Sequence, residues 1–437
     1  MASLTICHAL RHLSFVICHA FHPMDPVPVE EVTHLTLQVG RLLLASGTDT
    51  AEIQESMMRF AAAFGCEAHL IVGYQALLLT VVAGEQFRTK VGYRVPAMNV
   101  NMSAVAAVNR LLGEVGEGRL GLAEARKELE DIEHRSPVYA RWVVVIALGL
   151  TAASLARLFG SDWPTFWVSW LAGSIGMWLR QVLGRRGFNL FFIPFAAALA
   201  SGIIGGAGVR LGISGTPALC LVAPGMIIVP GVPLVNAVQD MIKNHMTVGI
   251  ARLGLGNLIT LAIAFGLFVA TSLTGAKIPV EAPLQLLSVP EDALFSALAA
   301  LGYLFLFNVP AGIGWACVVC GVASHTTRTL CMHLGVDVVT GTLIGALVVG
   351  FLAQGFARHF RAPAVAFAFA GVVAMIPGAF AFRAVIGCLQ IVQAGAAAAT
   401  ALVTETLALA ITCVLMVAAI AVGIAAPLIL TRKGAAL

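Results

Sequence analysis

Two proline–glycine pairs, Pro230-Gly231 and Pro377-Gly378, interrupt apolar stretches of the sequence. The first lies in a run, residues 224–233, that holds three prolines and two glycines. Each proline removes a backbone N–H donor and leaves a carbonyl without its helical partner. Carbonyls released within an apolar segment can bind a small polar ligand. The four residues are therefore candidate substrate-binding residues, with ordinary kinks that serve helix packing as the alternative.

Amide and charged side chains occupy further positions in these apolar stretches. A charge in hydrocarbon costs about 2.5–3.5 kcal/mol on insertion scales, so each such residue calls for a function or for contact with water. Asn236 and Asp240 are one turn apart and share a helix face just beyond the first pair. Asn189 is a further substrate-binding candidate, and so is Arg383, as a counter-charge or an anion clamp. An interfacial position in contact with water is the alternative for each.

Few acidic residues are available to bind a proton inside such stretches. Of the 22 acidic residues, seven follow position 140. Burial raises the pKa of a carboxyl toward physiological pH, as proton coupling requires. Four of the seven are expected in outside loops: Asp162, Glu281, Glu291 and Asp292. Asp240 is expected near loop level, so Asp337 and Glu405 are the proton-coupling candidates, with a helix N-cap as the alternative for Asp337.

The composition indicates what surrounds these residues. Apolar residues are 59% of the 437 and charged residues 11%, with a mean hydropathy of +0.92. In soluble domains, apolar residues make up about 45–50% and charged residues about 25%. The charges concentrate in the first 140 residues. The remainder needs lipid as its solvent, so the sequence predicts a membrane protein with a soluble N-terminal domain.

About ten apolar spans of near 20 residues are expected after position 140. Their approximate bounds are 141–160, 163–182, 188–208, 216–236, 253–273, 294–311, 312–330, 336–356, 363–383 and 401–429. Lys and Arg gather at the span ends on the side of the N-terminal domain. By the positive-inside rule, this domain and both termini are cytoplasmic.

Residues 27–138 are expected to form the α+β cytoplasmic domain. Helices are predicted at 28–46, 48–64, 101–115 and 122–133, and strands at 66–74, 75–82 and 86–95. Glu52 follows Asp49 by three residues, as in a capping box. Thr48 and Glu52 are assigned to gating by this domain. Residues 1–26 are interpreted as a disordered or spurious extension, in preference to a metal-binding clip.

The membrane part contains an internal repeat. A shift of 147 positions aligns the two Pro-Gly pairs, and a shift of 148 aligns Arg180 with Arg328 and Asn189 with Asp337. The second half thus has an ionisable group where the first has its neutral isostere, as a single proton site would require. Chance similarity between apolar helices is the alternative.

The repeat spans five helices, an odd number, so its two copies must be inverted relative to each other. We expect an all-α polytopic membrane protein with two inverted five-helix repeats, 139–275 and 294–437. An extracytoplasmic loop, 276–293, joins them. Inverted repeats with interrupted helices at corresponding positions are typical of secondary transporters that work by alternating access.

Several motifs resemble the threonine/serine exporter family. Residues 41–52 (RLLLASGTDTAE) resemble its opening motif, and 118–132 the helix before its first span. Residues 230–240 with 249–252 are similar to its membrane signature, and 376–379 to a short second module fused at the C-terminus. The resemblance implies an inner-membrane exporter of small amino acids, threonine or serine, or of dicarboxylates such as succinate. It also implies coupling to the proton gradient and a required N-terminal domain.

Other functions find less support in the residues. A hydrolase using the soluble domain would draw on Thr48, Asp49, Glu52, His34 and His69, but no nucleophile motif accompanies them. No phosphate-binding loop of an ATP-driven pump occurs. We expect no cofactor, metal or nucleic-acid partner. The expected partners are a small-molecule substrate, the proton gradient and the lipid bilayer, and a homo-oligomer is left open.

Overall fold

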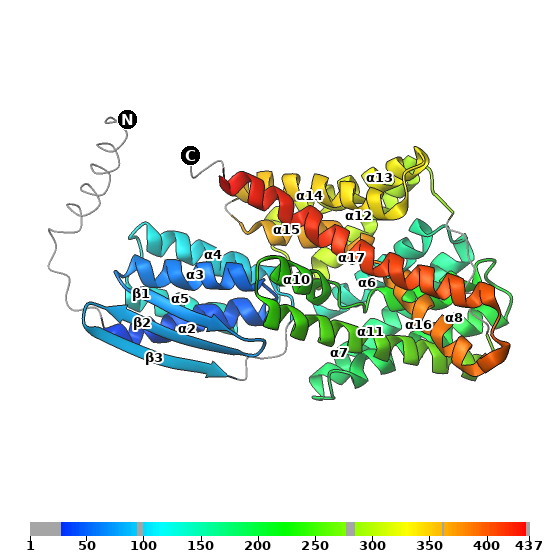
Figure 1. Cartoon of the computed structure of the whole chain (residues 1–437), viewed down its shortest axis with the longest axis horizontal. Coiled ribbons are helices and arrows are strands. Elements are labelled where there is room, and N and C mark those ends of the chain that lie inside the picture. The colour runs from blue at the N-terminus through cyan, green and yellow to red at the C-terminus, as the bar shows by residue number, and fades with distance from the viewer. Residues whose placement is uncertain (1–27, 94–98, 277–284, 361, 434–437) are drawn as a thin grey trace.

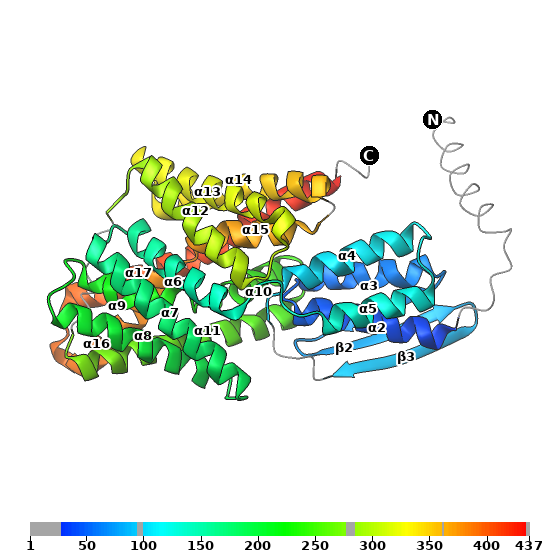
Figure 2. The same ribbon diagram turned by 180° about the vertical axis from the view of Figure 1, so that it is seen from behind.

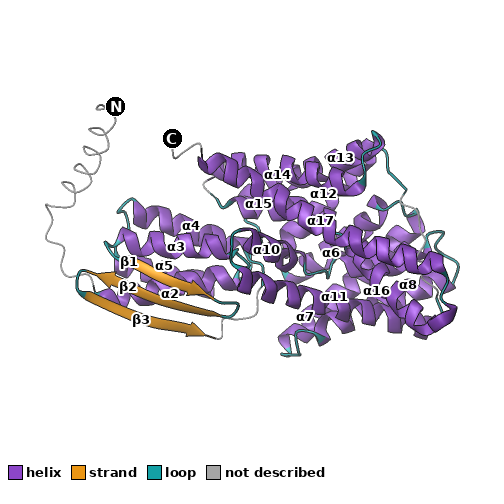
Figure 3. Ribbon diagram, in the orientation of Figure 1, coloured by secondary structure: helices purple, strands orange, loops and turns teal. Residues whose placement is uncertain are grey.

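The computed structural model describes residues 28–93, 99–276, 285–360 and 362–433. An N-terminal unit, residues 28–134, lies at one end of a larger helical body, residues 140–433 (Figure 1). Within the described residues, strands occur only in the N-terminal unit (Figure 3). The extension expected at 1–26 lies outside the described residues.

The N-terminal unit consists of four helices and a three-stranded antiparallel sheet of order β1-β2-β3. Its elements are α2 (Val29–Ala45), α3 (Thr50–Ala63), β1 (Glu67–Val72), β2 (Ala76–Ala83), β3 (Gln86–Tyr93), α4 (Met102–Gly116) and α5 (Leu122–His134). The order and type of these elements are as the sequence predicted. Alternate residues of β2, Leu77, Leu79 and Val81, are buried, where α2 and α3 pack on the sheet. Helix α4 contacts α2 and α3, and α5 contacts α2 and α4.

The helical body begins with α6 (Arg141–Leu158), α7 (Trp163–Arg185) and α8 (Phe192–Arg210). It continues with α9 (Pro217–Met226), α10 (Gly231–Ile242), α11 (Met246–Thr274), α12 (Val289–Leu306), α13 (Ala311–His333) and α14 (Val338–Phe360). Its last elements are α15 (Ala364–Val372), the short turn η1 (Val373–Met375), α16 (Gly378–Ala394), η2 (Gly395–Ala397) and α17 (Thr400–Lys433).

Fewer helices qualify as membrane spans than the ten expected. In the described part of the chain, seven are long and apolar enough, or eight if the bent pair α9 and α10 is one broken span. Helices α7 and α13 have 23 residues each, but Arg180 in the one, and His325 and Arg328 in the other, make them more polar. The chain is a multi-pass membrane protein, and the inverted relation of its halves stays a prediction.

The connection between the halves is shorter than the loop expected at 276–293. Helix α11 ends at Thr274, and α12 starts at Val289 rather than 294. Pro290 is in its first turn, where proline suits a helix start. Asp292 therefore belongs to a helix and is buried, so its assignment to a loop was wrong. Residues 277–284 lie outside the described residues.

Both Pro-Gly pairs begin a helix through the same turn. Pro230 precedes α10 with φ −77° and ψ 60°, and Pro377 precedes α16 with φ −78° and ψ 48°. In each turn the glycine N–H donates to the carbonyl two residues earlier, at 2.8 Å, which is an inverse γ-turn. We call residues 227–230 the first break and residues 376–377 the second break. At the first, α9 and α10 are bent by 66°.

Candidate functional site

The two breaks pack against each other. A Cβ atom added to Gly231 would lie 2.2 Å from Cδ1 of Ile376, and one added to Gly378 would lie 2.9 Å from Cγ2 of Val229. Each glycine thus contacts the residue that precedes the other break's proline. Glycine allows this approach because it has no Cβ. The pairing gives the two glycines a packing role between the breaks, and substrate binding by the Pro-Gly residues stays a prediction.

A cavity of about 250 Å³ adjoins the first break. Residues 227–233 form one wall, and the rest comes from α7, α8, α11, α12, η1 and the N-terminal unit. Tyr74 and Gln75 of the β1–β2 turn face it from that unit. Pockets for drug-sized ligands measure about 300–1,000 Å³, so this cavity suits a smaller metabolite.

Arg180 is the one charged side chain among the described residues that line this cavity. Helix α10 begins at its wall with Gly231, Val232 and Pro233. The N-terminus of a helix carries a partial positive charge and binds anions. The guanidinium and the helix start therefore make the cavity suitable for a carboxylate.

The first break also supplies hydrogen-bond acceptors. Ile227 and Ile228 line the cavity. Within the described part of the chain, no backbone N–H outside regular helices is seen donating to their carbonyls. Pro230, three residues after Ile227, has no N–H to donate, and the Gly231 N–H donates to the Val229 carbonyl instead. These carbonyls can accept hydrogen bonds from an ammonium group.

Asn236 and Asp240 share a face of α10 as predicted, but that face contacts the N-terminal unit. Nδ2 of Asn236 donates to the Gly47 carbonyl at 2.8 Å, and the Thr50 N–H donates to Oδ1 of Asp240 at 2.9 Å. Asp240 is fully buried in this contact, two residues before α10 ends. Neither side chain lines the cavity.

Arg252 of α11 completes this contact. Its Nη1 lies 2.8 Å from Oδ2 of Asp240, and its Nη2 donates to the Thr48 carbonyl at 2.9 Å. Beside it, Nζ of Lys243 lies 2.8 Å from Oδ1 of Asp49, which also caps α3. The opening motif and the membrane signature are therefore two sides of one interface. In both views α10 lies at the junction between the unit and the body (Figure 2).

The gating candidates lie at or next to this interface. The backbone of Thr48 contacts Arg252, and its hydroxyl is buried without a hydrogen-bond partner among the described residues. Glu52 lies in the first turn of α3, where its N–H donates to Asp49. Their gating role stays a prediction.

The remaining substrate-binding candidates do not line the cavity. Nη2 of Arg383 lies 3.7 Å from Oε1 of Glu405, which is 39% exposed. This favours the counter-charge interpretation of Arg383 over the anion clamp. Asn189 is exposed before α8, where its Oδ1 accepts from the Phe191 N–H at 2.8 Å.

Asp337 is the N-cap of α14. Its Oδ1 accepts from the Val339 and Thr340 N–H groups at 2.9 and 3.0 Å, and the side chain is exposed. Hydrogen bonds from Thr340 hold the pKa of the Asp337 carboxyl below its usual value. The burial that proton coupling requires is therefore lacking here, and the capping interpretation is the better one.

Sequence reasoning missed a buried cluster formed by Asp292, His325, Arg328 and Thr329. Two signals could have found it. Pro290 marks a helix start that places Asp292 in the first turn. In addition, His325, Arg328 and Thr329 recur at helical spacing in a span whose polarity was already unusual.

Comparison with known proteins identifies the family. A family model described as "Putative threonine/serine exporter" matches residues 34–274, and one described as "Threonine/Serine exporter, ThrE" matches residues 292–430. The order of the two modules confirms the predicted fusion.

Three relatives represent the curated proteins that the chain resembles. The "Probable succinate transporter subunit YjjP" of Escherichia coli (strain K12) is 29% identical over 252 residues, which are 56% of this chain and 96% of that protein. The "Probable threonine/serine exporter" of Mycobacterium tuberculosis is 26% identical over 83% of this chain and 71% of that protein. The "Threonine/serine exporter" of Corynebacterium glutamicum is 23% identical over 84% of this chain and 77% of that protein.

No solved structure matches the chain. The first family model covers more than half of the residues, and the second covers most of the remainder. The hydrolase alternative is therefore wrong, because this is a family of transporters and not of enzymes. The chain belongs to the threonine/serine exporter family, with both of its modules in one polypeptide.

Proposed function

We propose that this protein exports a small amino acid, such as threonine or serine, across the plasma membrane by alternating access around its two breaks. The family and two of the relatives are named for the export of amino acids, threonine and serine. The observation that carries the proposed substrate and mechanism is the cavity at the first break. It combines one cationic side chain, Arg180, with backbone carbonyls that have no helical partner. In this proposal the N-terminal unit and both termini are cytoplasmic, and the proton gradient drives export.

Both charges of an amino acid find complementary groups in the cavity. Its carboxylate would pair with Arg180 and the start of α10, because both carry positive charge. Its ammonium would donate to the carbonyls of Ile227 and Ile228, and the polar side chains of Tyr74 and Gln75 are available to a hydroxyl group.

A dicarboxylate is the second candidate, because one relative is named as a succinate transporter subunit. Succinate carries two negative charges at neutral pH, and a site for it would hold a cation for each. The described residues around this cavity include Arg180 and no second cation. The single cation therefore favours a substrate with one carboxylate.

The arrangement of cavities supports alternating access. The cavity of about 250 Å³ adjoins the N-terminal unit, and only a space of about 10 Å³ follows between the breaks, with Val229 and Ile376 in its wall. Such a space holds at most one water molecule. In this conformation the substrate can reach the first break from the side of the N-terminal unit, and the packed breaks close the path beyond it.

Transport by purified protein in liposomes tests the proposal. We expect uptake of labelled threonine or serine by the wild type and its loss in Arg180→Gln. Arg185→Gln is the matched control, because this arginine ends the same helix and is exposed away from the cavity. Transport of succinate alone would favour the second candidate. Normal threonine transport by Arg180→Gln would contradict the assigned site.

A further inference from the structure

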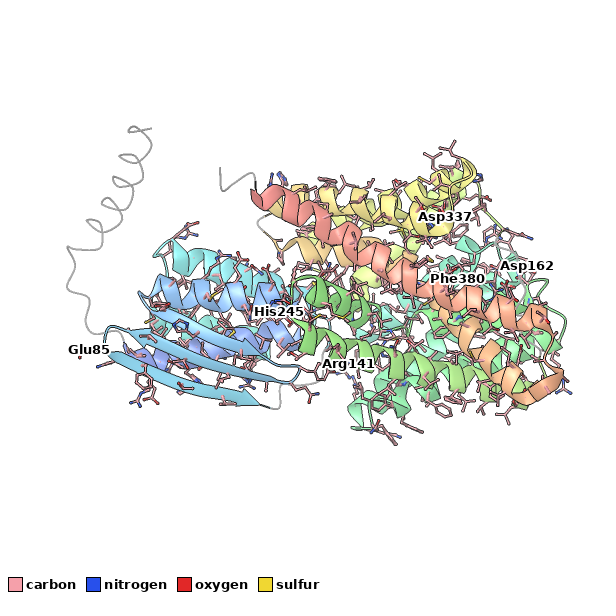
Figure 4. All side chains as sticks on the ribbon, viewed as in Figure 1. Glu85, Arg141, Asp162, His245, Asp337 and Phe380 are labelled. Atoms are coloured by element: carbon pink, nitrogen blue, oxygen red, sulfur yellow. The ribbon has the colours of Figure 1, made fainter. Side chains whose placement is uncertain are left out.

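The buried Asp292 cluster lies at the end of the helical body that is far from the N-terminal unit. Helix α12 contacts that unit through the turn at Phe307 and Asn308, and Asp292 lies about 20 Å from this turn at about 1.5 Å per residue. Figure 4 shows the same end of the body, marked by Asp337 and Asp162. If the N-terminal unit is cytoplasmic, the cluster is near the outer face.

Asp292 receives hydrogen bonds from several side chains of α13. Nδ1 of His325 lies 2.8 Å from Oδ2, and the Thr329 hydroxyl donates to the same oxygen at 2.6 Å. The Thr326 hydroxyl donates to Oδ1 at 3.2 Å. Asp292 and His325 are both essentially inaccessible to solvent, so this carboxylate depends on these groups for its stabilisation.

The contact between Arg328 and His325 determines where the protons are. The Arg328 guanidinium is hydrogen-bonded to Nε2 of His325. A guanidinium only donates, so Nε2 must be the acceptor and carries no proton. The imidazole is therefore neutral, and its single proton is on Nδ1, directed at Asp292. The cluster as a whole holds one positive and one negative charge.

We propose that this cluster is the proton-coupling site of the transporter and that its protonation releases Arg328. The inference rests on the proposed function and deepens it. A proton added to Nε2 of His325 turns an acceptor into a donor that faces the donors of Arg328. Two cations that present only N–H groups repel each other, so the guanidinium must move away. The Asp292 carboxylate stays beside the imidazolium and neutralises it.

A small space lies beside Arg328. Arg328 and Thr329 line a space of about 20 Å³ together with Leu158, Phe159 and Phe380. Helix α16 carries Phe380 just after the second break. Once released from His325, the guanidinium beside this space would offer its charge to a carboxylate that has passed the breaks. Uptake of a proton from outside would thereby prepare the exit side for the substrate.

The repeat alignment supports a coupling role for one half only. Arg328 aligns with Arg180, which lines the large cavity near the N-terminal unit. In the same alignment Asp292 and His325 correspond to Val144 and Met177, which cannot bind a proton. Each half thus has an arginine next to a cavity. Only the second half has ionisable groups, Asp292 and His325, that would make the position of its arginine depend on pH.

Other ionisable groups lie on the surrounding elements: Arg157, Glu291, Cys331, His333, Asp337, Arg383 and Glu405. Arg157 lies over the Trp163 ring, and His333 is hydrogen-bonded to the Leu287 carbonyl. The sequences of α15 and η1 contain no ionisable side chain. In the described part of the chain, none of these groups is seen bonded to the Asp292 carboxylate, so its ionisable partners are His325 and the nearby Arg328.

Transport in liposomes with and without a pH gradient tests the inference. The variants are His325→Gln and Asp292→Asn, and Asp337→Asn is the control because that carboxyl is exposed at the same end. We expect both cluster variants to lose gradient-driven accumulation of threonine, and the pH dependence of any remaining threonine exchange. The control should keep both. Accumulation with a wild-type pH profile in either cluster variant would overturn the inference.

A second measurement does not depend on transport. The unfolding temperature of the wild type in detergent should fall between pH 7 and pH 5, because the unfolded chain takes up a proton on His325 more readily than the folded cluster, which would have to give up the contact with Arg328. His325→Gln should show a smaller fall over this range, since it has no imidazole to protonate. Identical pH dependence in the two proteins would contradict the proton site, even if the wild type transported none of the substrates and the proposed function itself failed.

Discussion

Arg252 and Asp240 form an ion pair in which neither side chain has any solvent exposure, with 2.8 Å between Nη1 and Oδ2. Their other hydrogen bonds go to the backbone of Thr48 and Thr50 in the N-terminal unit. A buried pair of this kind stabilises only while both members and their additional hydrogen bonds are present. The pair therefore depends on the docked N-terminal unit, and the unit depends on the pair.

Replacement of one member of this pair should be costly. Arg252→Met leaves the Asp240 carboxylate buried and unpaired, so we expect a loss of about 3–5 kcal/mol in the free energy of unfolding in detergent. Arg252→Met combined with Asp240→Leu should lose less, because no charge remains buried. Lys243→Met is the control, since that pair is partly exposed and should contribute about 0–1 kcal/mol. Equal losses in Arg252→Met and Lys243→Met would contradict this account.

The contact between the breaks leads to a second prediction. Gly231→Leu and Gly378→Leu should insert into the membrane but lose transport, because the added side chains would collide with Ile376 and Val229. Overpacking of this kind costs about 1–3 kcal/mol. Gly254→Leu is the control, since nothing lies within 4 Å of a Cβ at that position of α11. Liposome transport, with insertion checked by membrane extraction, measures the effect. Export at the control's rate by either break variant would remove the breaks from the transport path.

Asp162 allows a prediction of pH dependence. Burial acts to raise the pKa of its carboxyl, but hydrogen bonds from Thr165, Gly215 and Thr216 outweigh this and hold the pKa below its usual value. The ionised Asp162 carboxyl therefore stabilises the fold fully above the pKa of about 3.9 that an Asp side chain has in the unfolded chain. This stabilisation is lost as the pH falls through the lower pKa of the carboxyl in the folded protein. We expect the unfolding temperature of Asp162→Ala to fall less than that of the wild type below about pH 4. Parallel curves for the two proteins would show that these hydrogen bonds contribute nothing.

Local pattern predicted the elements well and their partners poorly. The turn at Asp49, the strand predicted at 75–82 and the two Pro-Gly interruptions depend on neighbours in sequence, and each was found at its predicted place. Asn236 and Asp240 were placed on one helix face correctly. Their contacts, Gly47 and Thr50, lie about 190 residues earlier in the chain, and spacing within a helix carries no information about them.

Asp292 also shows that local sequence pattern does not predict tertiary contacts. Its side chain would be exposed in a loop, and it is buried because α12 begins before it and α13 brings three hydrogen-bond donors to it. Asp337 and Glu405 were preferred as proton sites on their positions along the chain, although the structure leaves Asp337 exposed and Glu405 only partly buried. Burial of an ionisable group is a property of the tertiary structure, which the sequence pattern did not reveal here.

The N-terminal unit is attached to both halves of the helical body. Besides the Arg252 contact with the first half, it binds the α12–α13 turn of the second half. There Nδ2 of Asn308 donates to Oδ1 of Asn101 at 2.8 Å, and the Met102 N–H donates to the Phe307 carbonyl at 2.9 Å. If the halves move relative to each other during transport, one of these attachments must open in every cycle.

The attachment to the second half is the weaker one, because it consists of neutral, partly buried hydrogen bonds worth about 0.5–1.5 kcal/mol each. We therefore predict that Asn308→Ala leaves the KM for threonine nearly unchanged and raises the maximal transport rate, provided that opening of this contact limits the cycle. Arg252→Met should lower the rate, since it loosens the attachment that has to persist. Rates measured in liposomes at several threonine concentrations separate the two effects. A fall in rate for Asn308→Ala as large as that for Arg252→Met would mean that the unit holds both halves throughout the cycle, and that it does not gate transport by releasing one of them.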